Sequence, residues 1–482
     1  MKSRAFLVVS VILAFSLLLV TPASALFLPS NGQAATLVLG QPDFTSDSLS
    51  GGATGMRSPT SVTVDPTTGK VFVADGRNQR VLRFVSVSAL ANGAAAEAVL
   101  GEPDFTTVSS DLNQHQMDTP FSVAVDANGS LWVADGEHDR ILRFDNASTK
   151  ANGADADGVL GQPDFTTEVL QTTQNGMASP GHMAVDASGR LWVADFANNR
   201  ILRFDNAAAK ANGADADGVL GQPDFTSATA SATQSGMNHP VGVAVDAGGR
   251  LWVSDYLNNR VLRFDNAASK ANGANADAVL GQPDFTSSAG SLSQSGMSVP
   301  RGVSLDPNGR LYVVDGGNDR VLIFDSAGSL PDGANASYVL GQPNFTTGDC
   351  TAGASDASLC MPDGAFFDPA AKVLWVADYG FNRVLMYGQP YATLHILPFI
   401  GLVRLFLPPG VTPIGSISIE TQDGSLQTFD VSPDVRILPS KRAGQLSVGS
   451  FVTLLTRLDE STGHMTVFQI VVHPNGVGPA SP

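Results

Sequence analysis

The stretch HPVGVAVDAGGRLWVSDYLNNRVLRF, from His239 to Phe264, decides the fold because the chain repeats it. Near-copies begin at Pro59, Pro120, Pro180, Pro240, Pro300 and Pro362, and successive copies are 61, 60, 60, 60 and 62 residues apart. Each copy except the last is followed by a polar connection and a segment that resembles VLGQPDF. Repetition at this regular spacing indicates an architecture built from equivalent units.

Each unit has the pattern of short strands. Apolar residues alternate with small or polar ones, as at Val243, Val245, Leu251 and Val253. A period of two predicts strands with one buried face, and the turn residues between them divide each copy into three strands. VLGQPDF supplies a fourth strand, and Asp265–Gly273 could form one helical turn before it. Six units of four antiparallel strands predict an all-β, six-bladed β-propeller.

The N-terminal strand is expected to close the ring. The first VLGQPDF segment, Val38–Phe44, precedes the first three-strand copy, whereas none follows the last copy after Met386. We therefore predict that the N-terminal strand completes blade six beside three C-terminal strands. This arrangement removes two open sheet edges.

The repeated pattern PxGVAVDxxGRLWVADxxNNRVLRFD resembles the NHL repeat over roughly Leu37–Gly388. Blade one departs from it at Phe72 and Val85, and blade six at residues 381–382 and 386–387. Some NHL propellers bind RNA through a basic face. NHL-like propellers also include metal-dependent lyases, and the related lactonase propellers hold a divalent ion in the channel. The resemblance therefore implies a binding or catalytic site at the channel mouth.

Charge and targeting features limit the possible partners and the location. The 482 residues carry a formal net charge of −17, which argues against a nucleic acid partner. Residues 1–25 combine Lys2 and Arg4 with an apolar run and an Ala-Ser-Ala site, which predicts a secretory signal peptide; the alternative is an uncleaved anchor. We expect a secreted or periplasmic, cell-envelope protein. Its two cysteines, Cys350 and Cys360, are expected to form a disulfide.

The tail predicts a second domain. Residues 389–412 contain an apolar stretch broken by prolines, which we interpret as an apolar linker; a membrane-surface segment is the alternative. Residues 413–475 contain about five segments with strand patterns. They predict a small, closed antiparallel β-barrel of the OB type, similar to small β domains appended to exported bacterial proteins.

One face of the propeller collects the candidate ligand-binding residues. The connections into the blades and the loops between second and third strands lie on the same face, which we call the loop-rich face. The residues of these loops differ between blades while the strands repeat. Such variation is typical of a binding face on a constant scaffold, and it is also expected of solvent-exposed positions without a function. The predicted ligand-binding residues are Phe121, His182, Phe196, Tyr256, Arg301, Asp363 and Tyr379.

Other polar residues have structural interpretations. Six aspartates each precede an arginine by five residues, as Asp255 precedes Arg260, and six identical pairs predict a structural role. The zinc candidates are His115, His138, His182 and His239, which occupy non-equivalent repeat positions. The ADADG segments at residues 154–158 and 214–218 match only half of a calcium loop. We therefore expect no metal, cofactor or catalytic residue.

These observations favour an exported, monomeric, non-catalytic scaffold that holds a protein, peptide or glycan outside the cytoplasm. The rival hypothesis is a metal-dependent lyase or hydrolase with its site at the channel mouth.

Overall fold

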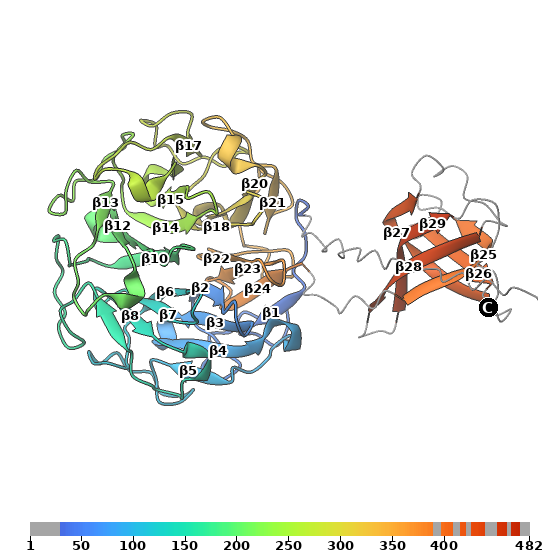
Figure 1. The fold of residues 1–482 in the computed structure, drawn as a ribbon, viewed down its shortest axis with the longest axis horizontal. Helices are drawn as coiled ribbons and strands as arrows, with labels where there is room; N and C mark the ends of the chain where they lie inside the picture. The colour runs from blue at the N-terminus through green and yellow to red at the C-terminus, as the bar shows by residue number, and fades with distance from the viewer. Residues whose placement is uncertain are drawn as a thin grey trace, which may run out of the picture.

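The computed structural model describes residues 29–388 and five strands of the tail within residues 397–472. Residues 29–388 form a ring of six four-stranded sheets (Figure 1), which confirms the predicted propeller. The predicted signal peptide, residues 1–25, lies outside the described residues. None of the helices in the described part of the chain has the length and hydropathy that a membrane-spanning helix requires.

The first three blades follow the chain in order. Blade one contains β2 (Pro59–Val64), β3 (Lys70–Asp75), β4 (Arg80–Ser86) and β5 (Ala98–Leu100). Blade two contains β6 (Pro120–Val125), β7 (Leu131–Asp135), β8 (Arg140–Phe144) and β9 (Gly158–Leu160). Blade three contains β10 (Pro180–Val185), β11 (Leu191–Asp195), β12 (Arg200–Phe204) and β13 (Gly218–Leu220).

The other three blades complete the ring. Blade four contains β14 (Pro240–Val245), β15 (Leu251–Asp255), β16 (Arg260–Phe264) and β17 (Ala278–Leu280). Blade five contains β18 (Pro300–Leu305), β19 (Leu311–Asp315), β20 (Arg320–Phe324) and β21 (Tyr338–Leu340). Blade six contains β22 (Ala365–Asp368), β23 (Val373–Asp378), β24 (Arg383–Tyr387) and, as its outer strand, β1 (Leu37–Leu39).

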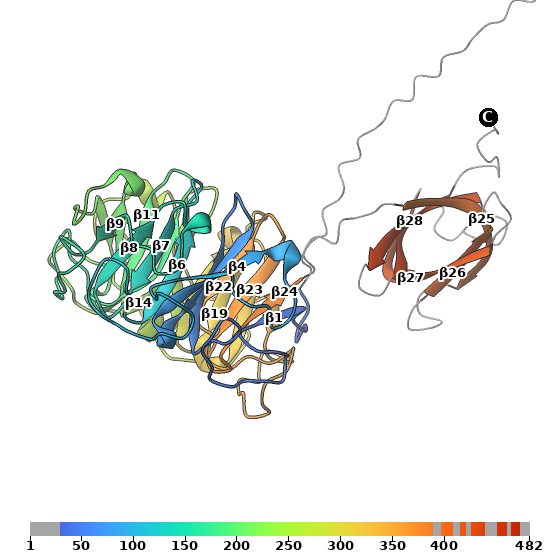
Figure 2. The same ribbon diagram turned by 90° about the horizontal axis from the view of Figure 1, so that it is seen from below.

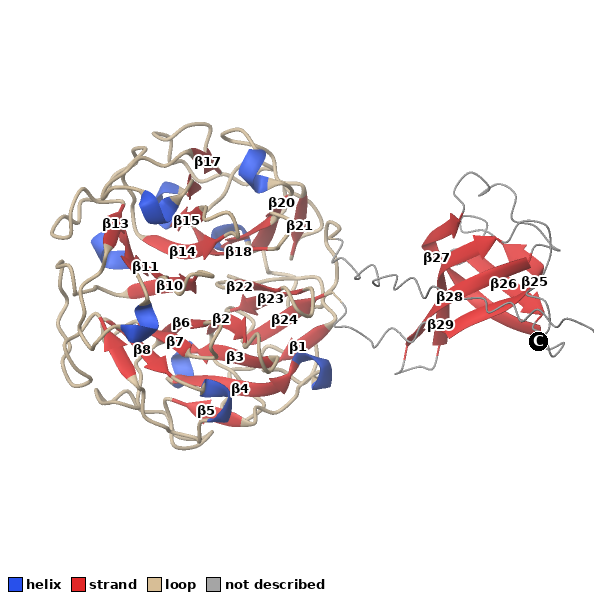
Figure 3. Ribbon diagram, in the orientation of Figure 1, coloured by secondary structure: helices blue, strands red, loops and turns tan. Residues whose placement is uncertain are grey.

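Short 3-10 turns, blue in Figure 3, join the strands. Between second and third strands lie η1 (Gly76–Asn78), η4 (Phe196–Asn198), η6 (Tyr256–Asn258) and η8 (Gly316–Asn318). After third strands lie η2 (Val87–Ala89), η3 (Ala147–Thr149), η5 (Ala207–Ala209), η7 (Ala267–Ser269) and η9 (Ala327–Ser329). The helical turn expected in Asp265–Gly273 is thus the 3-10 turn η7.

Neighbouring blades share their apolar cores. Trp192 and Ile201 of blade three pack with Val243 and Leu251 of blade four in one buried cluster. Met237, from the connection between these blades, fills the same cluster. The ring therefore owes its stability to interfaces that repeat from blade to blade.

The Asp–Arg pairs fix the connections of the loop-rich face. Asp195 ends β11, Arg200 opens β12, and Arg200 Nε lies 2.6 Å from Asp195 Oδ2 with both side chains buried. Arg200 Nη2 donates to the carbonyl oxygens of Thr173 and Gly176 in the connection entering blade three. Arg200 Nη1 donates to Phe225 O in the connection leaving it. All six pairs are buried in the same way, which supports their structural interpretation.

Blade six closes as predicted. Leu37, Val38 and Leu39 pair with Met386, Leu385 and Val384. Arg383 also donates across the junction, to Phe44 O. The N-terminal strand therefore supplies both a sheet edge and an acceptor for the blade-six arginine.

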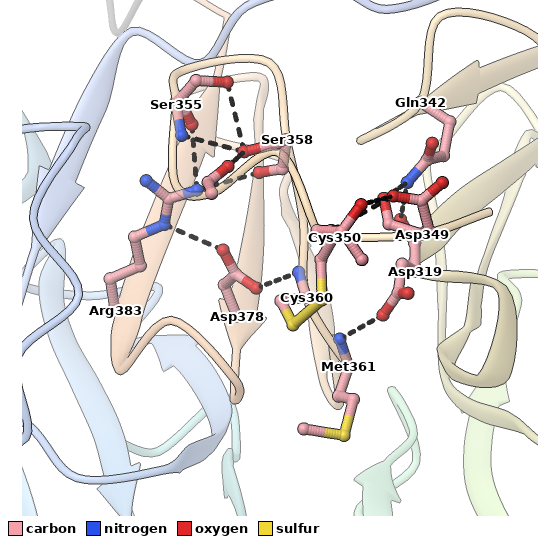
Figure 4. The surroundings of a disulfide bond; sticks show 12 residues. Asp319, Gln342, Asp349, Cys350, Ser355, Ser358, Cys360, Met361, Asp378 and Arg383 are labelled. Atoms are coloured by element: carbon pink, nitrogen blue, oxygen red, sulfur yellow. Dashed lines mark hydrogen bonds and ion pairs between the residues drawn. A yellow bond between two sulfur atoms is a disulfide. The ribbon is translucent and has the colours of Figure 1, made fainter. Parts of the chain in front are cut away.

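The predicted disulfide joins Cys350 to Cys360 beside this junction (Figure 4). Cys360 N–H donates to Asp378 Oδ1 at 2.7 Å, and the next amide, that of Met361, donates to Asp319 Oδ1 at 2.6 Å. The bridged connection thereby contacts blades five and six. The bridged connection is equivalent to the connections that enter the other blades. Its Leu359 is buried at the position where those connections have methionine.

The tail strands form a closed five-stranded barrel (Figure 2). They are β25 (Leu397–Leu407), β26 (Gly415–Glu420), β27 (Leu426–Leu438), β28 (Phe451–Asp459) and β29 (His464–Val472). Two expectations need correction. β25 lies within residues 389–412, the predicted linker, and pairs with both β26 and β28. The barrel is also not wholly antiparallel, because β27 and β29 are parallel.

Deleting Leu37–Phe44 from the full chain should sharply lower stability. The deletion exposes the edge of β24 and removes the Phe44 carbonyl that accepts from Arg383. Thermal unfolding followed by circular dichroism measures the effect. A truncated chain that melts like the intact one would contradict the importance of this closure.

Candidate functional site

The candidate site lies where the first strands of the blades meet at the channel. These strands approach closely, since a Cβ atom at Gly364 would lie 2.5 Å from Thr60 O and 3.2 Å from His182 Cε1. Gly302 N–H donates to Asp363 O at 2.8 Å, which links blade five to the segment that leads into β22. The channel mouth is therefore narrow, and residues from distant blades come into direct contact there.

Asp363 bridges the channel mouth. Its Oδ1 lies 3.1 Å from His182 Nε2, and its Oδ2 pairs with Arg301 Nη1. His182 belongs to β10 of blade three and Asp363 to blade six, so this contact joins opposite sides of the ring, where Figure 1 shows β10 and β22 facing each other. Asp363 is fully buried, and both of its carboxylate oxygens have a partner.

The neighbours of Asp363 keep it ionised. Burial alone would raise the pKa of its carboxyl group, but the Arg301 charge and the His182 hydrogen bond outweigh burial and hold the pKa below its usual value. The Asp363 carboxylate in turn raises the pKa of Arg301. The bridge therefore carries a permanent ion pair at neutral pH.

An aromatic cluster lies beside this bridge, in blades three to five. Phe196 contacts His239 edge to face with 4.7 Å between ring centroids, and Tyr256 in the same way at 6.1 Å. The Arg301 guanidinium lies over the Tyr256 ring at 5.6 Å from its centroid. Phe196, Tyr256 and Arg301 are each partly exposed, so this cluster offers a contact surface to a ligand.

The other two predicted residues lie outside this cluster. Phe121 contacts His182 edge to face at 5.3 Å and so borders the bridge from blade two. Tyr379 in blade six lies under Arg77 of blade one, at 6.0 Å from ring centroid to Cζ. Six of the seven predicted residues thus form one set joined by direct contacts. Tyr379 contacts Arg77 and is linked to this set through its electrostatic interaction with Arg301.

Sequence reasoning missed two features of this set. It gave no role to the contact of His239 with Phe196, and it did not predict the contact between His182 and Asp363. The second could have been inferred, because blades three and six are opposite in a six-bladed ring. Nothing in the local pattern indicates the first.

The four histidines do not gather into a metal site among the described residues. His115 is paired with Asp155 at 3.2 Å, and His138 with Asp135 at 2.9 Å. His182 contacts Asp363 and His239 contacts Asn238. In the described part of the chain, the potential ligand atoms that cluster are those of Asp319, Cys350 and Cys360, and the two sulfurs are bonded to each other.

Comparison with protein families supports the repeat assignment. The NHL repeat model matches residues 56–84, 177–204, 237–264 and 297–324, in blades one, three, four and five. This chain is a six-bladed β-propeller that contains NHL repeats. No curated protein sequence matches this NHL propeller.

Several solved structures are weakly similar to this chain. A streptogramin B lyase has 13% identity and a TM-score of 0.41 over 72% of this chain and 95% of its own. An auxiliary nutrient binding protein from Bacteroides thetaiotaomicron has 12% identity and a TM-score of 0.47 over 74% of this chain and 76% of its own. Likeness at this level supports no inference about the activity of this chain.

Asp363→Ala should destabilise the NHL propeller by about 2 to 3 kcal/mol, because Arg301 and His182 lose their shared partner. Because the folded-state pKa of Asp363 is lowered, its contribution is present above the unfolded pKa of about 3.9 and is lost as the pH falls through the folded pKa. The difference in unfolding free energy between the two proteins should therefore shrink in acid.

Guanidinium unfolding between pH 3 and pH 7 measures this difference. Asp356→Ala is the matched control, because Asp356 is exposed in the same connection. Equal losses for the two variants would show that the bridge contributes nothing specific.

Proposed function

We propose that this NHL propeller is an exported, non-catalytic binding scaffold whose loop-rich face holds a protein, peptide or glycan. The observation that carries the proposal is the cluster of Phe196, Tyr256 and Arg301 beside the Asp363 bridge. Tyrosine and arginine are enriched at energetically important interface positions. The bridge holds Arg301 in place, so little side-chain freedom remains to be lost on binding.

The exposed apolar residues support the choice of face. Every large apolar side chain that is strongly exposed among the described residues lies in a connection into a blade or in a loop between second and third strands. They are Leu49, Val108, Val169, Leu170, Leu257, Leu292 and Met361. The connections at the other end of the blades contribute none of these seven residues, so apolar contact with a ligand is favoured on the loop-rich face.

The charge of the same connections favours a basic ligand. They carry sixteen aspartates and glutamates, but only two arginines, Arg57 and Arg77, and no lysine. The five lysines between residues 29 and 388 lie at the other end of the blades, at positions 70, 150, 210, 270 and 372. A protein or peptide segment with basic and apolar side chains therefore fits this face best.

The metal-dependent enzyme remains the rival. Its catalytic ion would need free ligands at the channel mouth, where Asp363 already has His182 on one oxygen and Arg301 on the other. Catalysis at this position would require the bridge to open. This requirement favours the scaffold over the enzyme.

Export forms part of the proposal. The disulfide between Cys350 and Cys360 is typical of an oxidising compartment outside the cytoplasm. We infer that residues 1–25 direct the chain there, and that the ring acts as a monomer, because β1 already covers the edge of blade six.

Tyr256→Ala and Phe196→Ala should each weaken a captured ligand at least about tenfold, because truncating an interface hot spot costs about 2 kcal/mol or more. The melting temperature should change little, because both rings are partly exposed. A random peptide display library and a glycan array, screened with the full chain, supply the ligands for calorimetric titration.

Asp215→Ala is the control, because Asp215 is an exposed residue at the opposite end of blade three. If the control weakens capture while the two aromatic variants do not, the ligand binds elsewhere. If neither screen selects a ligand that discriminates Tyr256→Ala, the scaffold proposal fails.

A further inference from the structure

In five of the six blades, a buried glutamine holds the connection that leaves the blade through hydrogen bonds of its side-chain amide. We call this arrangement the latch. In blade two, Gln162 Nε2 donates to Asp139 O at 3.1 Å and to Val169 O at 3.0 Å. In blade three, Gln222 Nε2 donates to Asn199 O and Thr229 O, both at 2.9 Å. Gln41, Gln282 and Gln342 repeat the arrangement. The two amide protons thus satisfy two main-chain carbonyl groups at once.

Blade one has Glu102 at this position. Its Oε1 accepts from Ser109 N–H, as Gln162 Oε1 accepts from Val169 N–H seven residues further on. Glu102 is 0% exposed, and its Oε2 has no hydrogen-bond partner within the described chain. By equivalence with blade two, Oε2 corresponds to the amide nitrogen of Gln162, and Gln79 and Ser109 correspond to Asp139 and Val169, whose carbonyl groups accept from that nitrogen.

The backbone of blade one keeps the geometry of the other blades. A Cβ atom at Gly101 would lie 2.9 Å from Gln79 O, and one at Gly161 would lie 2.9 Å from Asp139 O. The carbonyl group that the latch normally satisfies is therefore in place. An ionised carboxylate here would face two carbonyl oxygens with no proton between them, in a site closed to water.

We propose that Glu102 is a neutral carboxylic acid in the folded protein, with its proton on Oε2 donated to the main-chain carbonyl group of Gln79 or Ser109. The protonated acid reproduces one of the two amide hydrogen bonds of the latch. The site is thus a proton-binding site that exists in blade one and is replaced by an amide in the other five.

The surrounding charges agree with this assignment. Burial raises the pKa of Glu102, and the nearby Asp104 and Asp111 carboxylates raise it further. The Ser109 amide and the Arg80 guanidinium act in the opposite direction and are outweighed.

Ionisation of Glu102 weakens the latch. A carboxyl group with a raised folded-state pKa contributes stability that is fully present below the unfolded pKa, about 4.3 for glutamate, and is lost as the pH rises through the folded pKa. The connection from Gly101 to Thr119 should therefore loosen as the pH rises, whereas the five amide latches do not respond.

Glu102→Gln installs the residue of the other blades and is the sharpest test. An infrared difference spectrum between the full-length wild type and this variant should contain a protonated carboxyl band at pH 6, where a free glutamate is almost fully ionised. Because the variant amide makes two hydrogen bonds and the acid makes one, the variant should melt slightly above the wild type near pH 4.5, and this difference should grow by about 2 to 4 °C at pH 8.5. The slowing of amide exchange in residues 101–119 by the substitution should likewise be larger at the higher pH.

Gln222→Glu transfers the acid to blade three and should transfer the pH dependence with it. Absence of the carboxyl band at pH 6, or equal melting curves for the wild type and Glu102→Gln at every pH, would overturn the proposal. A metal ion in this oxygen cluster would also overturn the proposal. In that case added Ca²⁺ or K⁺ at pH 8.5 would raise the melting temperature of the wild type but not that of Glu102→Gln.

Discussion

The buried Asp–Arg pair is the interaction on which the rest of the propeller depends. Taking both charges out of water is costly, and the pair is retained because each arginine also satisfies carbonyl groups of two connections. Connections of nearly twenty residues without regular structure would otherwise hold many unsatisfied backbone groups. Because the guanidinium fixes the backbone of these connections, their side chains are free to vary. Phe196 and Tyr256, which follow Asp195 and Asp255 directly, are placed by this device.

The period and polarity of the repeat were sufficient to predict the ring and its closure, since both depend on counting equivalent units. The disulfide was predictable for another reason, because the chain has two cysteines and the features of an exported protein. The tail was less predictable. Pro398 suggested an interruption, but it lies in the half of β25 that pairs with β28 alone, where one side of the strand needs no amide donor. The parallel pairing of β27 with β29 is set by tertiary packing. The alternation of apolar and polar residues within either strand does not indicate it.

For the candidate site, the pattern predicted which face varies but not which varied residues meet. His182 and Asp363 are 181 residues apart, and they meet because the ring has an even number of blades and a narrow channel. The small residues Gly302 and Gly364 allow that narrowness, and their role follows from backbone distances that no local motif encodes. Arg301 and Tyr256 likewise come together through the packing of blade five against blade four.

A repeat protein provides its own controls, because a substitution in one unit can be judged against the same position in the others. In blade two, titratable residues replace amides at two positions. His138 has the position at which four blades have asparagine, and Asp139 has the position at which three blades have asparagine. Burial and nearby carboxylates raise the pKa of Asp139 to about 6, while Asp135 raises that of His138 against the effect of burial. Replacing an amide by an acid keeps the hydrogen-bond acceptor that the fold requires, as Asp139 Oδ1 still accepts from Ser179 N–H. Replacing an amide by a base keeps the donor, because His138 Nδ1 lies 2.9 Å from Asp135 Oδ2, where Asn198 Nδ2 donates to Asp195 in blade three. Such exchanges add a titratable group without altering the backbone. Burial also raises the pKa of Asp319, which has the Asp139 position in blade five, so individual blades of the ring acquire a dependence on pH that blades with asparagine there lack.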